Sequence, residues 1–178
     1  MVWRMGEQLG DVTIRTADVD DAGEVARVHI ASWRGAYAGI VSADYLASLD
    51  PAAHEPRWVE NLRNGPRDGV QTWIAWSEDR ALGFVSLGPS RDEDAARNEQ
   101  EIYSIYLDPG MWGHGVARDL MRTILGEVRS PAPVSLWVFA DNERARHFYR
   151  RHGFVADGTE RMHEFGGHDL LEVRYRRR

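Results

Sequence analysis

The order of apolar and polar positions along the chain predicts a sheet covered by helices. Strands are predicted where β-branched and aromatic residues run together, and helices where apolar residues recur every three or four positions. The strongest hairpin pattern joins 70–76 to 81–87 through Ser77-Glu78-Asp79-Arg80. Gly83 inside the second run predicts a bulge or a close backbone contact. The charged stretch 88–100 is predicted to be a loop in solvent, and 176–178 a solvated end. The remaining predictions are a strand at 12–15, a helix ending near 37–39, a helical region within 40–69, a strand at 101–107, a helix from 116, a strand at 134–140, a helix at 142–152 and two late strands, one opening at 154–155 and one at 169–175. This order predicts an α+β fold, a mixed α/β sandwich with helices packed on a central sheet.

Residues 101–125 carry the pattern that predicts a function. Residues 101–107 are rich in Ile and Tyr, as expected for a buried strand, and Pro109 then ends the ladder. Apolar residues fall at helical spacing from Val116 onward. The turn between strand and helix carries Gly113 and Gly115. It therefore lies where the new helix exposes unpaired backbone N–H groups.

This turn is suited to bind an anion. Glycines let the backbone approach a ligand without an intervening Cβ atom. The first-turn amides and the positive end of the helix dipole then favour a phosphate group. The turn is not a dinucleotide fingerprint, because no G-x-G-x-x-G opens it, and no Lys-Ser/Thr pair follows as in a P-loop.

Two stretches, the glycine turn with its flanks at 109–120 and the later run 136–154, resemble motifs of one known family, the GCN5-related N-acetyltransferases (GNAT). The run Pro109-Gly110-Met111-Trp112-Gly113-His114-Gly115-Val116-Ala117 resembles the coenzyme A pyrophosphate loop, usually written Q/R-x-x-G-x-G/A. Gly115 and Ala117 fill the two small positions, and Trp112 stands where Gln or Arg is usual. The stretch 136–154 is similar to the family's strand, then N-x-x-A, then F-Y-x-x-x-G-F. Because both motifs occur in the family's order and separation, the resemblance is specific, and it covers about residues 12–176.

The resemblance implies a GNAT-like central mixed sheet of about seven strands flanked by about four helices. Parallel strands four and five splay apart in that family, and acetyl-CoA, the implied co-substrate, lies in the gap. The backbone of Ile105, Tyr106 and Leu107 would bind the pantetheine arm, and Asn142 would approach from the other side. The pyrophosphate would be surrounded by the turn and the helix start, namely Trp112, Gly113, His114, Gly115, Val116, Ala117 and Arg118.

Acetyl transfer to an amine sets the requirements for catalytic residues. The amine must lose a proton before it attacks the thioester, and the departing thiolate benefits from a proton donor. Tyr149 matches the Tyr of F-Y-x-x-x-G-F and is the candidate donor; the alternative is an aromatic residue that only packs beside Phe148. Glu101 is the candidate base, directly or through a water molecule. Its alternative is a surface carboxylate at the start of a strand.

Candidates for the acceptor site are less specific. Trp33 and Tyr37 lie one helical turn apart and could line an acceptor pocket, although core packing is the more common role. Strand alternation places Tyr103 on the same face as Glu101 and Ile105, where it could position the acceptor. The segment 40–69 corresponds to one that flanks the acceptor pocket in the resembling family.

Composition narrows the class of protein. The 178 residues fit one domain, with 1–10 as an extension and 11–178 as a single acetyltransferase domain. A net charge of −6 argues against nucleic acid as a partner, and the absence of Cys excludes disulfides and thiolate catalysis. The seven histidines show no zinc-ligand spacing, so no metal is expected. No apolar run reaches membrane-spanning length and no signal peptide is evident, which predicts a cytoplasmic protein.

These observations predict an acetyl-CoA-dependent N-acetyltransferase that acts directly on a primary amine, with a small molecule favoured. The alternatives are acetylation of a protein N-terminus or lysine, and a non-catalytic module that senses acyl-CoA. Dimers are common in the resembling family, so a homodimer through the late strands is a further expectation.

Overall fold

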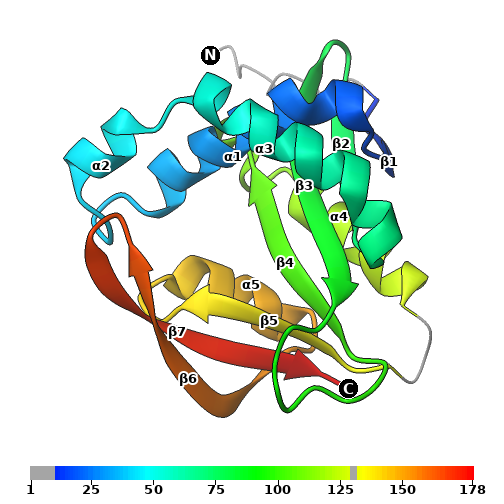
Figure 1. Ribbon diagram of the computed structural model, residues 1–178, viewed down its shortest axis with the longest axis vertical. Coiled ribbons are helices and arrows are strands. Elements are labelled where there is room, and N and C mark those ends of the chain that lie inside the picture. Colours follow the sequence, from blue (N-terminus) through cyan, green and yellow to red (C-terminus); the bar gives the residue numbers. More distant parts are fainter. Residues whose placement is uncertain (1–10, 129–131) are drawn as a thin grey trace, which may run out of the picture.

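The computed structural model describes residues 11–128 and 132–178, which form one sheet with helices on both faces (Figure 1). The predicted extension 1–10 lies outside the described residues. The strands are β1 (Thr13–Thr16), β2 (Gln71–Ser77), β3 (Arg80–Pro89), β4 (Gln100–Leu107), β5 (Val134–Phe139), β6 (Val155–Phe165) and β7 (His168–Arg177). The α-helices are α1 (Ala22–Ala36), α2 (Ala43–Ser48), α3 (Pro51–Asn64), α4 (Val116–Glu127) and α5 (Glu143–Arg151). Short 3-10 helices η1 (Val19–Asp21), η2 (Gly65–Asp68) and η3 (Pro109–Met111) complete the described part.

The seven strands are ordered β1-β2-β3-β4-β5-β7-β6, and only β4 and β5 run parallel. That pair is joined at three positions, from Gln100–Val134 to Ile102–Leu136. Beyond them the two strands diverge, which Figure 1 shows as the gap between the light green and yellow arrows. The predicted fold class and the splayed parallel pair are therefore confirmed.

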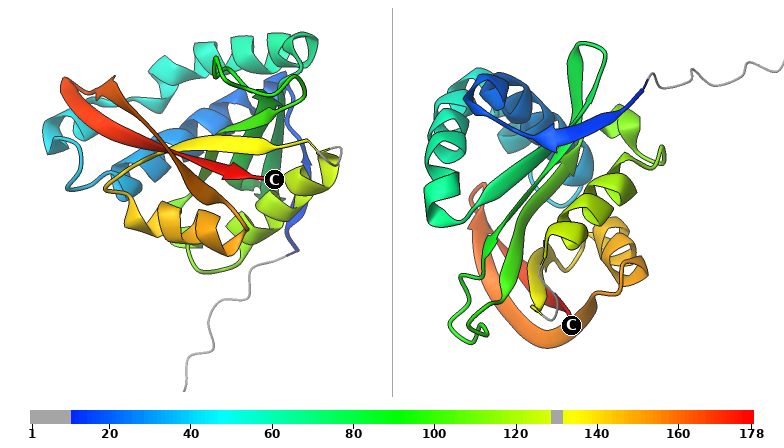
Figure 2. Two further views of the ribbon diagram at one scale, coloured as in Figure 1. Left: turned by 90° about the horizontal axis from the view of Figure 1, so that it is seen from below. Right: turned by 90° about the vertical axis from the view of Figure 1, so that its right-hand side faces the viewer.

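Helices form a layer on each face of the sheet (Figure 2). The amphipathic helix α4 buries Leu120, Met121 and Ile124 against the strands, in a core that Tyr149 of α5 joins. On the opposite face, α1 buries Val25 and Val28 against the sheet. A third cluster lies under α2 and the tip of the β6–β7 hairpin, so it connects the first helices with the last strands.

The predicted β2–β3 hairpin is confirmed, and so is the irregularity expected near Gly83. The register shifts by one residue between Ala75–Gly83 and Trp76–Ala81. A Cβ atom on Gly83 would lie 2.9 Å from Leu107 Cγ and 2.9 Å from the Tyr106 carbonyl oxygen. Glycine is therefore required here because β3 approaches β4 closely.

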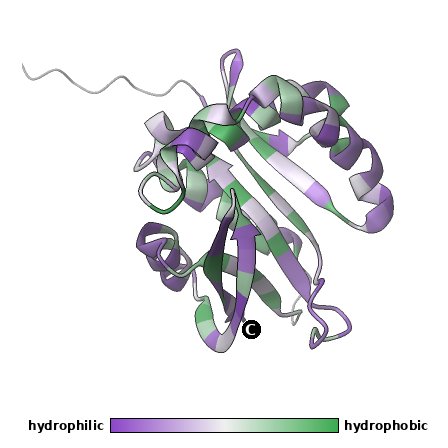
Figure 3. Ribbon diagram, turned by 60° about the vertical axis from the view of Figure 1, so that its left-hand side comes forward, coloured by the Kyte–Doolittle hydropathy of each residue, from purple (hydrophilic) through white to green (hydrophobic). Residues whose placement is uncertain are grey.

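The charged loop 90–99, predicted to lie free in solvent, is instead fixed to the last strands. Its hydrophilic residues are apparent in Figure 3. Arg174 of β7 is only 3% exposed; it donates through Nε to Asp157 (2.7 Å) and through Nη2 to Asp94 (2.7 Å). Arg176 likewise donates to Glu99 (2.8 Å). The expectation that 176–178 form a solvated tail is thus wrong for 176 and 177, which belong to β7. Local pattern could not reveal partners so distant in sequence.

Candidate active site

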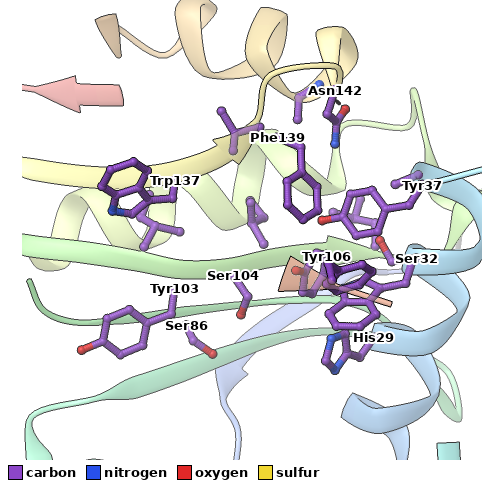
Figure 4. A pocket seen from close by; sticks show the side chains of 18 of the residues that line it. His29, Ser32, Tyr37, Ser86, Tyr103, Ser104, Tyr106, Trp137, Phe139 and Asn142 are labelled. Carbon is purple, nitrogen blue, oxygen red and sulfur yellow. Dashed lines mark hydrogen bonds between the residues drawn. The ribbon is translucent and has the colours of Figure 1, made fainter. Parts of the chain in front are cut away.

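A cleft of about 1380 Å³ occupies the region where β4 and β5 separate. Its walls include residues of both strands, of α1 and α3, of the turn before α4, and of α5. Figure 4 shows part of this lining, with Tyr37, Tyr106 and His29 gathered where α1 meets the strands, and Tyr103 farther along the cleft. The cleft therefore connects the turn before α4 with an aromatic region beneath α1.

The turn before α4 has the geometry of an anion site. The Asp108 side chain accepts from Gly110 N and stabilises η3, which starts the turn. Gly113 and Gly115 then adopt φ values of 84° and 88°, a conformation that favours glycine. Gly115 is the N-cap residue of α4 and carries no capping side chain. The first-turn amides, which lack partners within the helix, are thus left to a ligand.

The cleft is lined by most of the residues predicted to bind the coenzyme, specifically Ile105, Tyr106, Leu107, Trp112, Gly113, Gly115, Ala117, Asn142 and Tyr149. Three others lie outside its lining. The His114 side chain is exposed, with Nδ1 3.1 Å from the Trp112 carbonyl oxygen. The side chain of Val116, the first residue of α4, is buried in the core, and Arg118 pairs with Asp119. Val116 can thus meet a ligand only through its backbone.

Two residues of α5 and its cap, Asn142 and Tyr149, line the cleft. The Asn142 side-chain oxygen accepts from Ala145 N (3.1 Å) and caps the helix, so the amide N–H₂ remains as a donor. Tyr149, two turns later, is 8% exposed and also lines the cleft. Burial raises its pKa well above the ordinary value for tyrosine. The phenol therefore keeps its proton at neutral pH.

Glu101 lines the cleft but is tightly bound by Arg91. The Glu101 side chain is 2% exposed, and its Oε2 accepts from Arg91 N (3.0 Å) and Arg91 Nε (3.2 Å). Arg91 Nη2 also donates to Oε1. This arginine was missed at the sequence level, because it belongs to the loop that was predicted to be free. The ion pair and the backbone amide of Arg91 hold the carboxylate in one position.

Tyr103 lies on the side of Glu101, as predicted, but Ile105 does not. The β3–β4 register passes from Ser86–Ser104 to Leu87–Ile102, so Tyr103 is an extra residue in a β-bulge. Tyr103 stacks beneath the Arg91 guanidinium, 4.0 Å from the ring centroid. Ile105 packs in the core beneath α4 instead. The bulge breaks the strict alternation that the prediction assumed.

Trp33 and Tyr37 both line the cleft, within an aromatic compartment formed by α1, β5 and β6. Their rings lie 4.5 Å and 5.7 Å from that of Phe165, and Tyr37 also packs at 5.1 Å on Phe139. Burial is the main reason that the pKa of Tyr37 is raised. Phe139 and Phe165 were not identified from sequence, because single aromatics in strands give no functional pattern.

His29 is a further lining residue that the sequence did not reveal. Its Nδ1 accepts a hydrogen bond from Trp58 Nε1 (3.1 Å), and its ring stacks on Tyr106 at 5.0 Å. Burial lowers the pKa of His29 to about 4, with smaller contributions from His54 and Arg57. The imidazole is therefore neutral at pH 7, with its proton on Nε2.

Two negative findings concern the described part of the chain. Among residues 11–128 and 132–178, no group of three or more His, Asp or Glu side chains could hold a metal ion. Within the same ranges, none of the helices has the length and apolar character needed to span a bilayer.

Comparison with known proteins agrees with this geometry. Residues 32–154 match the model of the acetyltransferase (GNAT) family. A probable N-acetyltransferase of Mycobacterium tuberculosis is 31% identical over 170 residues, which cover 93% of each protein. A spermidine N(1)-acetyltransferase of Thermoplasma acidophilum is 22% identical over 168 residues, or 92% of this chain and 98% of that protein. The crystal structure of the PaiA N-acetyltransferase from T. acidophilum in complex with coenzyme A superimposes with a TM-score of 0.74 at 19% identity, covering 94% of this chain and 98% of that one.

The splayed sheet and the cleft beside a glycine turn define an acyltransferase of the GNAT class. The chain belongs to the acetyltransferase (GNAT) family and is an N-acetyltransferase.

Proposed function

We propose that this enzyme transfers the acetyl group of acetyl-CoA directly to the primary amine of a small molecule. The observation that carries the proposal is the continuity of the cleft, which joins the phosphate-binding geometry of the α4 turn to the aromatic compartment under α1. A coenzyme and an acceptor that enter from these two regions meet in the β4–β5 gap. Direct transfer needs no covalent enzyme intermediate, which suits a chain without cysteine.

Tyr149 is proposed as the proton donor. The neutral amine attacks the thioester carbonyl carbon, the C–N bond forms and the C–S bond breaks, and the thiolate takes the phenol proton of Tyr149. The acceptor nitrogen gives up its extra proton to the base, and solvent returns a proton to Tyr149. Burial keeps the phenol of Tyr149 protonated in the resting enzyme, which a proton donor requires, although the same burial raises its pKa and makes it a weaker acid than an exposed tyrosine.

Glu101 is proposed as the base, acting through a water molecule. Arg91 occupies both carboxylate oxygens, and three hydrogen bonds are made there. The two oxygens of a carboxylate together offer about four acceptor positions, so one remains for water. The buried ion pair supports a base whose carboxylate is held in one position beside the cleft.

A small amine is favoured as acceptor because one end of the compartment is narrow. The β6–β7 turn meets α2 there: a Cβ atom on Gly166 would lie 2.7 Å from the Tyr45 ring. The Glu164 carboxylate lines the same region and favours a cationic ligand, whereas Glu172 is already paired with Arg161 at 2.6 Å. The T. acidophilum relative is named for spermidine, a polyamine, which agrees with this class of acceptor.

Release of free thiol from acetyl-CoA, measured over a panel of polyamines, monoamines and lysine-containing peptides, tests the proposal. We expect turnover with at least one small amine and a slower reaction with peptides. A Tyr149→Phe variant should bind coenzyme A as the parent does and lose about 10²-fold in kcat. Binding of coenzyme A without turnover on any amine would favour a sensor module, and preference for peptides would favour protein acetylation.

A further inference from the structure

Trp112 interrupts the coenzyme-loop motif at the position where a polar side chain is usual, and the structure shows what surrounds it. On one side, the indole packs against α1 at Gly35, where a Cβ atom would lie 2.8 Å from Trp112 Cη2. On its face lies the guanidinium of Arg144, 3.7 Å from the ring centroid. Arg144 comes from the first turn of α5, across the cleft from α1. The indole therefore bridges two helices at the mouth of the glycine turn.

Arg144 differs from its neighbours on α5 in its charge partners. Arg146 pairs with Glu143 at 2.6 Å, and Arg150 lies 3.8 Å from the same carboxylate. Arg144 forms no ion pair with any carboxylate in the described ranges, and burial alone shifts its pKa, downward. Its side chain nevertheless lines the cleft beside Gly113 and Gly115. A cation is thus held against an aromatic ring, next to the anion-binding turn, without an acid to neutralise it.

We propose that Arg144 binds a phosphate group of the coenzyme, supplying from α5 the polar contact that position 112 lacks. Stacking occupies the face of the guanidinium and leaves its in-plane N–H donors free, the geometry that pairs with phosphate oxygens. Trp112 acts as a positioning residue that holds this guanidinium at the turn. The inference rests on the proposed use of acetyl-CoA.

Calorimetry with coenzyme A provides the first test, with Arg144→Gln compared against Arg151→Gln. Arg151 is a matched control: it lies on the same helix, is exposed, and does not line the cleft. We expect Kd to rise about tenfold or more for Arg144→Gln, since a charge-assisted hydrogen bond is lost, and to stay within about twofold for Arg151→Gln. Arg144→Lys should fall between parent and Arg144→Gln, because lysine keeps the charge but not the planar stack.

Kinetics with S-acetylpantetheine, a thioester that lacks the nucleotide phosphates, separate phosphate binding from a structural role. With this substrate kcat/KM of Arg144→Gln should equal that of the parent, whereas with acetyl-CoA it should be about tenfold lower. An equal loss on both thioesters would overturn the inference, as would an unchanged Kd for coenzyme A. Failure of the parent itself to bind coenzyme A would overturn the proposed function as well.

Discussion

Replacing Arg174 by methionine should destabilise the enzyme strongly, although this residue lies outside the cleft lining. The guanidinium binds Asp92, Asp94 and Asp157 and also donates to Thr159 (2.8 Å). Methionine replaces the apolar stem of the side chain but removes the guanidinium, with its charge and all of these hydrogen bonds. The carboxylates of Asp94 and Asp157 are then left with the longer pairs to Arg176, which lies 3.3 Å from Asp94 and 3.5 Å from Asp157.

The magnitude follows from the burial of the network. Breaking a buried ion pair from one side costs about 3–5 kcal/mol of unfolding free energy. Arg174 is 3% exposed, but the Asp94 side chain is 56% exposed, so solvent screens part of that interaction. We therefore expect a loss of about 2–3 kcal/mol, which for a domain of this size lowers Tm by about 5–10 °C.

The effect should depend on pH in a definite direction. The Arg174 hydrogen bond lowers the pKa of Asp94 to about 2, below the value of about 3.9 in an unfolded chain. A depressed folded pKa contributes stability that is complete above about pH 4 and is lost as the pH falls toward 2. The difference between parent and Arg174→Met should therefore be smaller at pH 3 than at pH 7.

Urea unfolding followed by near-UV circular dichroism at both pH values measures this difference; guanidinium chloride is avoided because its ions screen charge pairs. Arg122→Met is the control. The Arg122 side chain is 71% exposed and lies 3.9 Å from its acidic neighbour Asp119, so less than about 0.5 kcal/mol should be lost. A loss below about 1 kcal/mol in Arg174→Met at pH 7, or one that is equally large at pH 3, would refute the reasoning.

Three further predictions concern the cleft and its walls. Glu101→Gln should lower kcat about 10²-fold or more, because an amide cannot take up the proton; a kcat equal to that of the parent would remove Glu101 from proton transfer. Gly83→Ala should lower the free energy of unfolding in urea by about 1–3 kcal/mol, because the added methyl group meets β4. Gly126→Ala is the control: a Cβ there would meet nothing within 4 Å, so this variant should not be less stable than the parent. The His29 imidazole has a pKa lowered to about 4, so it should stay neutral down to about pH 5 in a ¹⁵N NMR titration, and a midpoint above pH 6 would contradict its burial. Its contribution to the free energy of unfolding should decline as the pH falls from about 6.5 toward 4.

The features that sequence predicted are those set by neighbouring residues. The turn before α4 was predictable because Pro109, Gly113 and Gly115 act within a few positions of the helix they precede. The helix that follows Asn142 and the β2–β3 hairpin have the same local origin. Each of these elements depends on backbone geometry and spacing, which the order of residues contains directly.

The features that sequence did not predict depend on tertiary contacts. Arg91 reaches Glu101 because the loop before β4 folds back. The loop is held there by Arg174, which pairs with Asp92 and Asp94 although it lies far away in the sequence. The bulge at Tyr103 likewise arises from the pairing of β4 with β3, and it reversed the expected side of Ile105. No periodicity within a single strand contains that information.

The divergence of β4 from β5 has a consequence for the free and occupied enzyme. Both strands keep their outer partners, β3 and β7, while the backbone groups that face each other beyond Ile102 and Leu136 are not paired across the sheet. A ligand with amide groups of its own can insert there in the manner of an extra strand and satisfy them. Occupancy should therefore slow amide hydrogen exchange along 103–107 and 137–139, where β4 and β5 no longer pair with each other.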